Sequence, residues 1–328
     1  MNVEAVRKEA TNKLLDIPGV VGVGSPGKEI RVYVESLNPV EAELPAEIGG
    51  VPVVAFKTGK IYALSLLEFE TPWLYTQGAV IPKAATEAQR VNRHRPVIGG
   101  VSIGHTEITA GTMGTSLEFT GILNGLSNNH ILANSSTRQV PRAKVGDPIV
   151  QPGPYDGGTL ADKVGVLKKF IPMDRIGFNR VDAAVYEPTD PAQLSSEMYG
   201  ATPISGSAVP EVGQLMCKSG RTSGYTEAKI IDVDATVAVG YDEFEAKFEH
   251  QIVTDVMSGG GDSGSAGTIA GKFGGLLFAG SDIVTIFNRP DMVINELGLP
   301  RSSVPSPIGG LTPAPLLGIG LLAYLALK

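Results

Sequence analysis

The sequence predicts a mainly β protein that begins with a small α+β unit and ends with an apolar tail. From residue 97 to about residue 287, short apolar runs such as KVGVLKKF, KIIDVDATVAV and GGLLFAG are separated by Gly, Pro, Asn and Asp. Many short strands at this spacing, with no long helical pattern between them, are typical of a β-barrel or a β-sandwich. The 41 glycines and 23 prolines among 328 residues agree with a chain that turns often.

We divide the chain into four parts on these patterns. Residues 1–66 form the small α+β domain, residues 67–96 show no sustained period and are a predicted linker, residues 97–300 form the β domain, and residues 301–328 form the tail. A short helix is expected in RPDMVINELG, near the end of the β domain, because its proline suits a first helical turn and its glycine suits a C-terminal cap.

The small α+β domain combines a helix with three strands. Apolar residues recur at helical spacing from Val3 to Leu14, and Pro18-Gly19 ends that helix. Strands are predicted at VVGVG, EIRVYVE and VPVVAFKTG, with a short helix in PVEAELPAEIGG before the last of them.

Three glycines in this domain match the G-x-G-x-x-G pattern of dinucleotide-binding proteins. They are Gly22, Gly24 and Gly27. That pattern must open a helix after its strand, because the helix N-terminus holds the pyrophosphate. Here an alternating strand follows, so we interpret the glycines as part of a tight hairpin.

Charge and cysteine content narrow the functional class and the location. The net charge of −7 argues against a nucleic-acid partner, which would need a basic surface. Cys217 is the single cysteine, so no internal disulfide can form, which suits a reducing compartment. The charged N-terminus is not a secretory signal, and we therefore expect a cytoplasmic protein.

The apolar tail leaves two alternatives open. Residues 311–327 carry no charge, but Pro313 and Pro315 shorten the part that could be helical, and a membrane-spanning helix needs about 20 apolar residues. The tail is either a membrane or partner-docking segment or a segment packed on its own protein. We keep residues 311–327 as a candidate membrane contact.

The run SGGGDSGSAG, at residues 258–267, is the strongest candidate for a reactive loop. Glycine permits unusual backbone angles, so the amides of Gly261 and Ser263 can point at one spot and form an oxyanion hole. Ser263 would then be a nucleophile that needs a base and a group to orient that base. The alternative is an ordinary Ser/Gly loop.

The histidines decide which chemistry the loop can support. All four histidines precede Ser263, so the nucleophile-first order of α/β-hydrolases is excluded. They form no cluster of zinc ligands, and we expect no metal and no cofactor. His130, at the mouth of an apolar strand, is the candidate base, and Asp182, a single acid in the apolar run VDAAVY, is the candidate orienting group. The alternatives are a structural histidine and an acid that caps a turn.

Three separated motifs resemble those of the chymotrypsin/trypsin-like serine peptidases. SNNHIL, VDAAV and GGDSGSA carry His130, Asp182 and Ser263 in that order. LSNNHILAN, GDPIVQPGPYDGG and CKSGRTSGYTEAKI look like a bacterial, viral and plant subgroup that includes the plant narrow-leaf type. The resemblance covers about residues 97–298 and implies two β-barrels with the active site in the cleft between them.

The resemblance implies a serine endopeptidase that acts on polypeptides through an acyl-enzyme. Ser263 would attack the scissile carbonyl, His130 would carry the proton, Asp182 would fix the imidazole, and the amides of Gly261 and Ser263 would hold the oxyanion. Two alternatives stay open. One is a catalytically silent scaffold or peptide-binding protein on the same fold, and the other is an esterase with the same triad.

The sequence departs from the family pattern in ways that bear on specificity. Ser265 stands where the family often has glycine, and Met257 stands at a position that lines the specificity pocket. An acid at that position would select Lys or Arg substrates. With Met257 and the strand that contains Phe278, Ala279 and Gly280, we expect an apolar pocket that accepts small or apolar residues.

Maturation by a cut before Val97 is not expected. In secreted relatives a new terminus of that kind pairs with the acid before the catalytic serine, which here is Asp262. Pro96 follows Arg95, and proline on the leaving side of a bond blocks most trypsin-like cuts. We therefore expect an enzyme that is active without this cut, with residues 1–66 as a fixed targeting, inhibitory or docking module.

Overall fold

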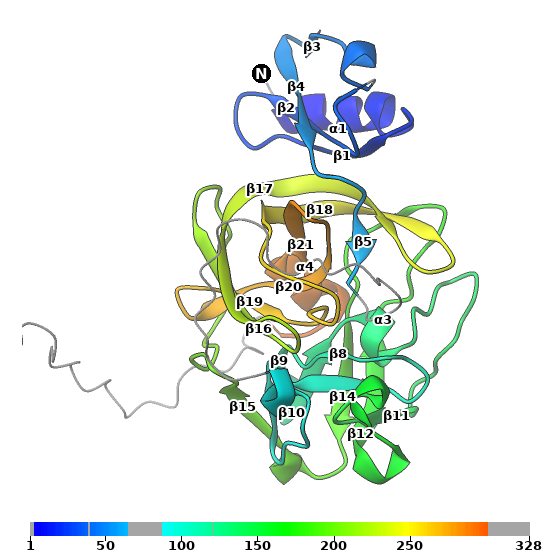
Figure 1. Cartoon of the computed structure of the whole chain (residues 1–328), viewed down its shortest axis with the longest axis vertical. Helices are drawn as coiled ribbons and strands as arrows, with labels where there is room; N and C mark the ends of the chain where they lie inside the picture. The colour runs from blue at the N-terminus through cyan, green and yellow to red at the C-terminus, as the bar shows by residue number, and fades with distance from the viewer. Residues whose placement is uncertain (1–2, 39, 65–86, 120, 301–328) are drawn as a thin grey trace, which may run out of the picture.

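The computed structural model describes residues 3–38, 40–64, 87–119 and 121–300, and it is mainly β (Figure 1). The N-terminal unit lies at one end of the molecule, and the β domain forms the rest. The predicted tail and residues 67–86 of the predicted linker lie outside the described residues. Within those residues, a single turn of helix, α2 (Glu87–Arg90), precedes the β domain. No helix of the described part is long and apolar enough to cross a membrane.

Six strands of the β domain close into a barrel, which we name the second barrel. Each strand pairs with the next around the ring, and the last pairs with the first. In ring order these strands are β16 (Leu215–Gly220), β17 (Gly224–Gly240), β18 (Glu245–Asp255), β21 (Val284–Asn288), β20 (Lys272–Gly280) and β19 (Ala266–Ile269). Closure removes the free sheet edges that the short strands would otherwise expose.

The other strands of the β domain form a second curved sheet, which we name the first barrel because it comes first in the chain. Its order is β8 (Gly111–Thr112), β7 (Ser102–His105), β11 (Pro148–Val150), β12 (Lys163–Phe170), β14 (Ala184–Pro188), β10 (Ile122–Ser127) and β9 (Thr115–Phe119). Only Met113 and Gly114 separate β8 from β9, so the two ends of this sheet lie on one stretch of chain. The sheet therefore curves back on itself, and the predicted two-barrel architecture is confirmed.

An apolar layer packs between the barrels. It combines residues of the first barrel, such as Leu117 and Leu126, with Phe273 and Leu276 of the second. The helix α4 (Pro290–Glu296) covers this layer and begins at its proline as predicted. Two short strands, β6 (Val97–Gly99) and β15 (Leu194–Met198), pair with each other, and β13 (Phe178–Asn179) pairs with β18.

The N-terminal unit contains the predicted helix and strands. They are α1 (Val3–Leu14), β1 (Val20–Gly24), β2 (Ile30–Val34) and β4 (Val51–Lys57), and the unit adds two short strands that were not predicted, β3 (Glu47–Ile48) and β5 (Tyr62–Ala63). The expected short helix in PVEAELPAEIGG is only a 3-10 turn at Val40–Glu43. Farther along the run, Glu47 and Ile48 form β3. β1 and β2 pair antiparallel, so the hairpin interpretation of the glycine pattern is confirmed.

The N-terminal unit is joined to the second barrel by backbone pairing. β1 lies antiparallel to β17, with Gly22 opposite Val237, so one sheet continues from the unit into the barrel. Gly22 has no room for a side chain, because a Cβ there would lie 2.7 Å from the carbonyl oxygen of Thr236. A salt bridge of 3.0 Å between Arg7 and Asp234 adds to the contact.

Candidate active site

His130 lies in the short helix α3 (Asn129–Leu132), directly after β10 of the first barrel. Its side chain is almost fully buried, with 3% of the residue exposed. Its Nδ1 lies 2.5 Å from Oδ2 of Asp182, and its backbone N–H donates to Oδ1 of the same carboxylate. Its Nε2 is buried and has no hydrogen-bond partner. Because buried polar atoms are nearly always hydrogen-bonded, we expect Nε2 to gain a hydrogen-bond partner when the site is in use.

Asp182 lies just before β14, which begins at Ala184 within the apolar run VDAAVY. It is fully buried. Besides His130, its carboxylate accepts a hydrogen bond of 2.8 Å from the Tyr241 hydroxyl. Its backbone is held by Asn288, whose Oδ1 accepts from the Asp182 N–H, and by Asn128, whose side-chain amide donates to the Asp182 carbonyl. These contacts fix one carboxylate oxygen against the imidazole.

Tyr241 and Asn288 are site residues that sequence reasoning missed. Tyr241 follows β17, and its ring lies edge-on to the His130 ring at 5.9 Å between centroids. Burial, together with the nearby Asp182 charge, raises the pKa of Tyr241 well above its ordinary value, so the hydroxyl remains a donor. Neither residue lies near His130 or Asp182 in the chain, so only the fold could reveal them.

Replacing Tyr241 with phenylalanine is expected to lower the free energy of unfolding by about 1.5–3 kcal/mol, since the lost hydrogen bond is made to a buried carboxylate. Urea denaturation measures this change. Tyr199→Phe is the matched control, because its hydroxyl bonds Gln89 at an exposed position. That control should stay within about 0.5 kcal/mol of the natural chain. Equal effects of the two variants would contradict a special role for the Tyr241 hydroxyl.

Ser263 lies in the loop between β18 and β19, on the second barrel, and is fully buried. The flanking glycines adopt left-handed backbone angles. Gly261 has φ of +90° and Gly264 has φ of +93°, and a Cβ on Gly264 would lie 2.2 Å from the carbonyl oxygen of Thr112. Side chains other than glycine are disfavoured at both positions.

The serine loop is tied to the first barrel close to the histidine. The Ser263 carbonyl accepts from the Thr112 N–H at 2.7 Å, and the Thr112 carbonyl accepts from the Ser127 hydroxyl at 2.7 Å. Ser127 ends β10, and His130 follows in the next helix. The fold thus brings all three predicted residues to the junction of the barrels. The Ser263 hydroxyl itself donates to the Phe278 carbonyl at 3.1 Å and not to Nε2 of His130.

The amide of Gly261, one of the two predicted oxyanion donors, already has a partner. It donates to the carbonyl oxygen of Leu64 at 2.8 Å. Leu64 also packs its side chain against an apolar cluster that contains Met257 and Leu277. Of the predicted pocket residues on β20, Gly280 lies close to the Leu64 side chain, whereas Phe278 and Ala279 belong to a separate core cluster that contains Phe248. Leu64 therefore contacts Gly261 and lies against the predicted pocket residues Met257 and Gly280.

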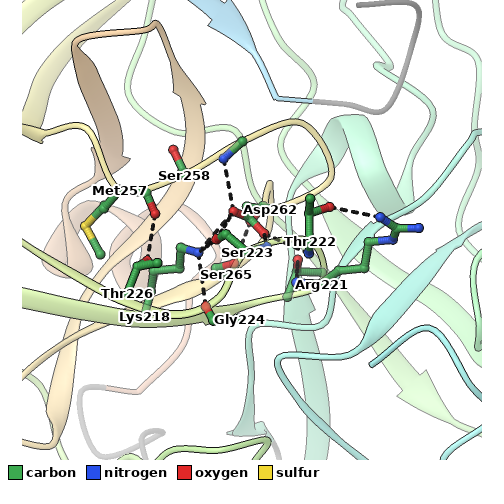
Figure 2. Close-up of polar contacts among 12 residues, drawn as sticks. Lys218, Arg221, Thr222, Ser223, Gly224, Thr226, Met257, Ser258, Asp262 and Ser265 are labelled. Atoms are coloured by element: carbon green, nitrogen blue, oxygen red, sulfur yellow. Dashed lines mark hydrogen bonds and ion pairs between the residues drawn. The ribbon is translucent and has the colours of Figure 1, made fainter. Parts of the chain in front are cut away.

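Asp262, next to Ser263, is held by an internal ion pair (Figure 2). Its Oδ2 lies 3.0 Å from Nζ of Lys218 on β16, and both side chains are fully buried. Burial raises the pKa of Asp262, but the Lys218 charge and hydrogen bonds from Ser223 and Gly259 outweigh it and lower the pKa below its ordinary value. Asp262 therefore stays ionised with Lys218 as its cation. Val97, the residue whose new N-terminus would pair with Asp262 after a maturation cut, lies buried in β6.

The described residues contain no group of three or more His, Cys, Asp or Glu that could hold a metal ion. The chemistry available at the barrel junction is that of a hydroxyl, an imidazole paired with a carboxylate, and backbone amides. Such a set can transfer an acyl group through a covalent intermediate.

Comparison with solved structures finds similar folds. A glutamic acid specific serine protease matches 62% of this chain and 98% of its own, with 21% identity and a TM-score of 0.45. Protease A of Thermobifida fusca matches 62% and 96%, with 18% identity and a TM-score of 0.46. A Nocardiopsis protease matches 62% and 96%, with 18% identity and a TM-score of 0.44. No protein-family model and no curated protein matches the chain.

Proposed function

We propose that the chain is a serine endopeptidase in which Ser263 is the nucleophile, His130 the base and Asp182 the group that orients His130. The observation that carries this proposal is the buried pair of His130 and Asp182, 2.5 Å apart, with the other imidazole nitrogen left without a partner at the barrel junction. An imidazole held in this way by a carboxylate is poised to take a proton from a hydroxyl.

The reaction follows from these positions. Ser263 Oγ turns from the Phe278 carbonyl toward Nε2 of His130, gives up its proton and attacks the scissile carbonyl carbon. The developing oxyanion accepts from the amides of Gly261 and Ser263. His130 then donates its proton to the leaving amine, and water hydrolyses the acyl-enzyme. Asp182, kept in place by Tyr241 and His130, stabilises the imidazolium throughout.

A fluorophosphonate probe tests the proposal, because it labels only an activated serine. The natural chain is compared with Ser263→Ala and with Leu64→Asp, which removes an apolar side chain from the cleft. Labelling that disappears only in Ser263→Ala supports the proposal. Absence of labelling in both the natural chain and Leu64→Asp would favour a silent peptide-binding scaffold, and turnover of esters without peptides would favour an esterase.

Specificity is expected to favour small or apolar residues before the scissile bond. Met257 is 4% exposed and lies in an apolar cluster with Leu277 of β20, whereas Phe278 and Ala279 belong to a separate core cluster that contains Phe248. A substrate Lys or Arg placed against the apolar side chains around Met257 would have no counter-charge, which costs several kcal/mol. A peptide-library profile measures the preference, and dominance of Lys or Arg would contradict the expectation.

A further inference from the structure

The segment from Thr58 to Leu64, which contains the two-residue strand β5, leads from the N-terminal unit to the proposed active site. In Figure 1, β5 descends from this unit toward α3. Ala63 pairs antiparallel with Ala279, and Tyr62 pairs with Gly280, both on β20 of the second barrel. On its other side the segment contacts β17, through the Gly240 N–H and the Ile61 carbonyl. The segment is therefore hydrogen-bonded to a strand of the second barrel on each side, β20 on one and β17 on the other.

Leu64 makes two backbone hydrogen bonds beside Ser263, and one of them is to Gly261, a proposed oxyanion donor. Its N–H donates to the Phe278 carbonyl at 3.1 Å, and its carbonyl accepts from the Gly261 amide at 2.8 Å. Its side chain joins the apolar cluster of Met257, and a Cβ placed on Gly280 would lie 3.2 Å from its Cδ1. Addition of a strand with one side chain in a pocket is a general mode of peptide recognition.

The residue before Leu64 lies beside the proposed base. Ala63 lines a pocket together with His130 and Tyr241. The dipeptide Ala63-Leu64 thus extends from the imidazole to the proposed oxyanion donor, which is the path that a substrate backbone would take. Ala63 and Ile61 are buried, with 6% and 1% of each residue exposed, so the fit is close.

We propose that residues 58–64 bind as an internal substrate, and that the chain cuts itself on the carboxyl side of Leu64. This proposal rests on the proposed peptidase function. The N-terminal unit, for which targeting, inhibitory and docking roles were open, is then an inhibitor that is covalently attached to the enzyme until the cut. While Leu64 fills the cleft, a second polypeptide cannot use the same pocket and the same backbone groups.

The cut balances as a single hydrolysis. Ser263 Oγ bonds to the Leu64 carbonyl carbon while its proton passes to His130, and the carbonyl oxygen keeps its hydrogen bond to Gly261. The bond from that carbon to the next nitrogen breaks, and the nitrogen takes the proton from His130. Water then supplies hydroxide to the carbon and a proton to the restored Ser263 hydroxyl. The products are a carboxylate at Leu64 and an amine at residue 65.

The N-terminal fragment is expected to stay bound after the cut. The pairing of β1 with β17 and the salt bridge between Arg7 and Asp234 do not depend on the broken bond. Cleavage must therefore be measured by intact mass under denaturing conditions, which separate the fragments. Full-length chains with the natural sequence, Ser263→Ala, Leu64→Asp and Leu64→Met are purified and followed over time.

The natural chain should yield a fragment that ends at Leu64 and one that starts at residue 65, and Ser263→Ala should stay intact. Leu64→Asp should slow the cut by at least about 100-fold, because an apolar pocket would have to desolvate a carboxylate. Leu64→Met, which keeps volume and polarity, should be cut at a rate within about tenfold of the natural chain.

The fluorophosphonate probe, applied to the same four samples, separates the two proposals. A natural chain that stays intact, or that is cut at another bond, overturns self-cleavage at Leu64. If such a chain or Leu64→Asp still labels, the peptidase survives. If neither labels, the peptidase proposal fails as well. A cut after Leu64 that persists in Ser263→Ala also overturns self-cleavage, because another enzyme must then have made it.

Discussion

Replacing Ser263 with alanine is expected to lower peptide hydrolysis by about 10⁴–10⁶-fold, because the variant can form no acyl-enzyme. The remaining rate would come from the oxyanion donors and from substrate binding. Initial rates with a peptide that carries an apolar residue before the scissile bond measure the effect. Leu64→Asp provides the reference activity, and Ser263→Ala is measured in the same Leu64→Asp background, because an uncut natural segment would fill the site.

The loss must be separated from a loss of structure. The Ser263 hydroxyl donates only one hydrogen bond, to the Phe278 carbonyl, so the thermal midpoint should change little. Ser207→Ala is a matched control, since that serine also donates to a backbone carbonyl of the second barrel, that of Phe273. It should keep full activity. Equal activity of Ser263→Ala and the natural chain would reject Ser263 as the nucleophile.

His130→Ala should produce a loss of similar size, and the double variant should lose little more than either single one. Residues that act as one unit have strongly non-additive effects, because removing either part already disables the step. Additive losses would show that Ser263 and His130 act in separate ways, which would contradict the proposed proton transfer between them.

Much of the fold could be predicted because its signals are local. Short apolar runs and turn glycines mark many strands of the β domain, such as β12, β17 and β20, and Pro18-Gly19 follows soon after the end of α1 at Leu14. The order of His130, Asp182 and Ser263 also lies in the sequence itself. The closure of each barrel could be expected only from the resemblance, since it depends on pairing between strands that are far apart in the chain.

The surroundings of the site could not be predicted for the same reason. Tyr241 reaches Asp182 from the end of a long strand, and Leu64 reaches Gly261 from the N-terminal unit, so neither has a local signal. Lys218 ends the run GQLMCK, where a lysine suggests a solvent-facing side chain. Its burial is understandable only with Asp262 opposite it, because a buried ammonium needs a charged partner.

The ion pair of Lys218 and Asp262 should have the largest effect on stability. The ammonium donates to Asp262 at 3.0 Å, to the Gly224 carbonyl at 3.2 Å and to the Ser223 hydroxyl. Asp262 in turn accepts from the N–H groups of Thr222 and Gly259, so it holds the loop that carries Gly261 and Ser263. Losing this carboxylate would disturb both the fold and the proposed oxyanion hole.

Lys218→Met is expected to lower the free energy of unfolding by about 3–5 kcal/mol, since it leaves the Asp262 charge buried without its cation. Asp262→Asn should have a similar cost. The double variant should cost clearly less than the sum of the two, because neither charge then remains unpaired. Denaturant unfolding of all three measures the coupling, with Lys229→Met on the exposed face of β17 as a control within about 0.5 kcal/mol. Additive single costs would mean that the two side chains stabilise the loop independently. In that case the pairing of Lys218 with Asp262 would not be what orders the loop, and the loop would need another source of order.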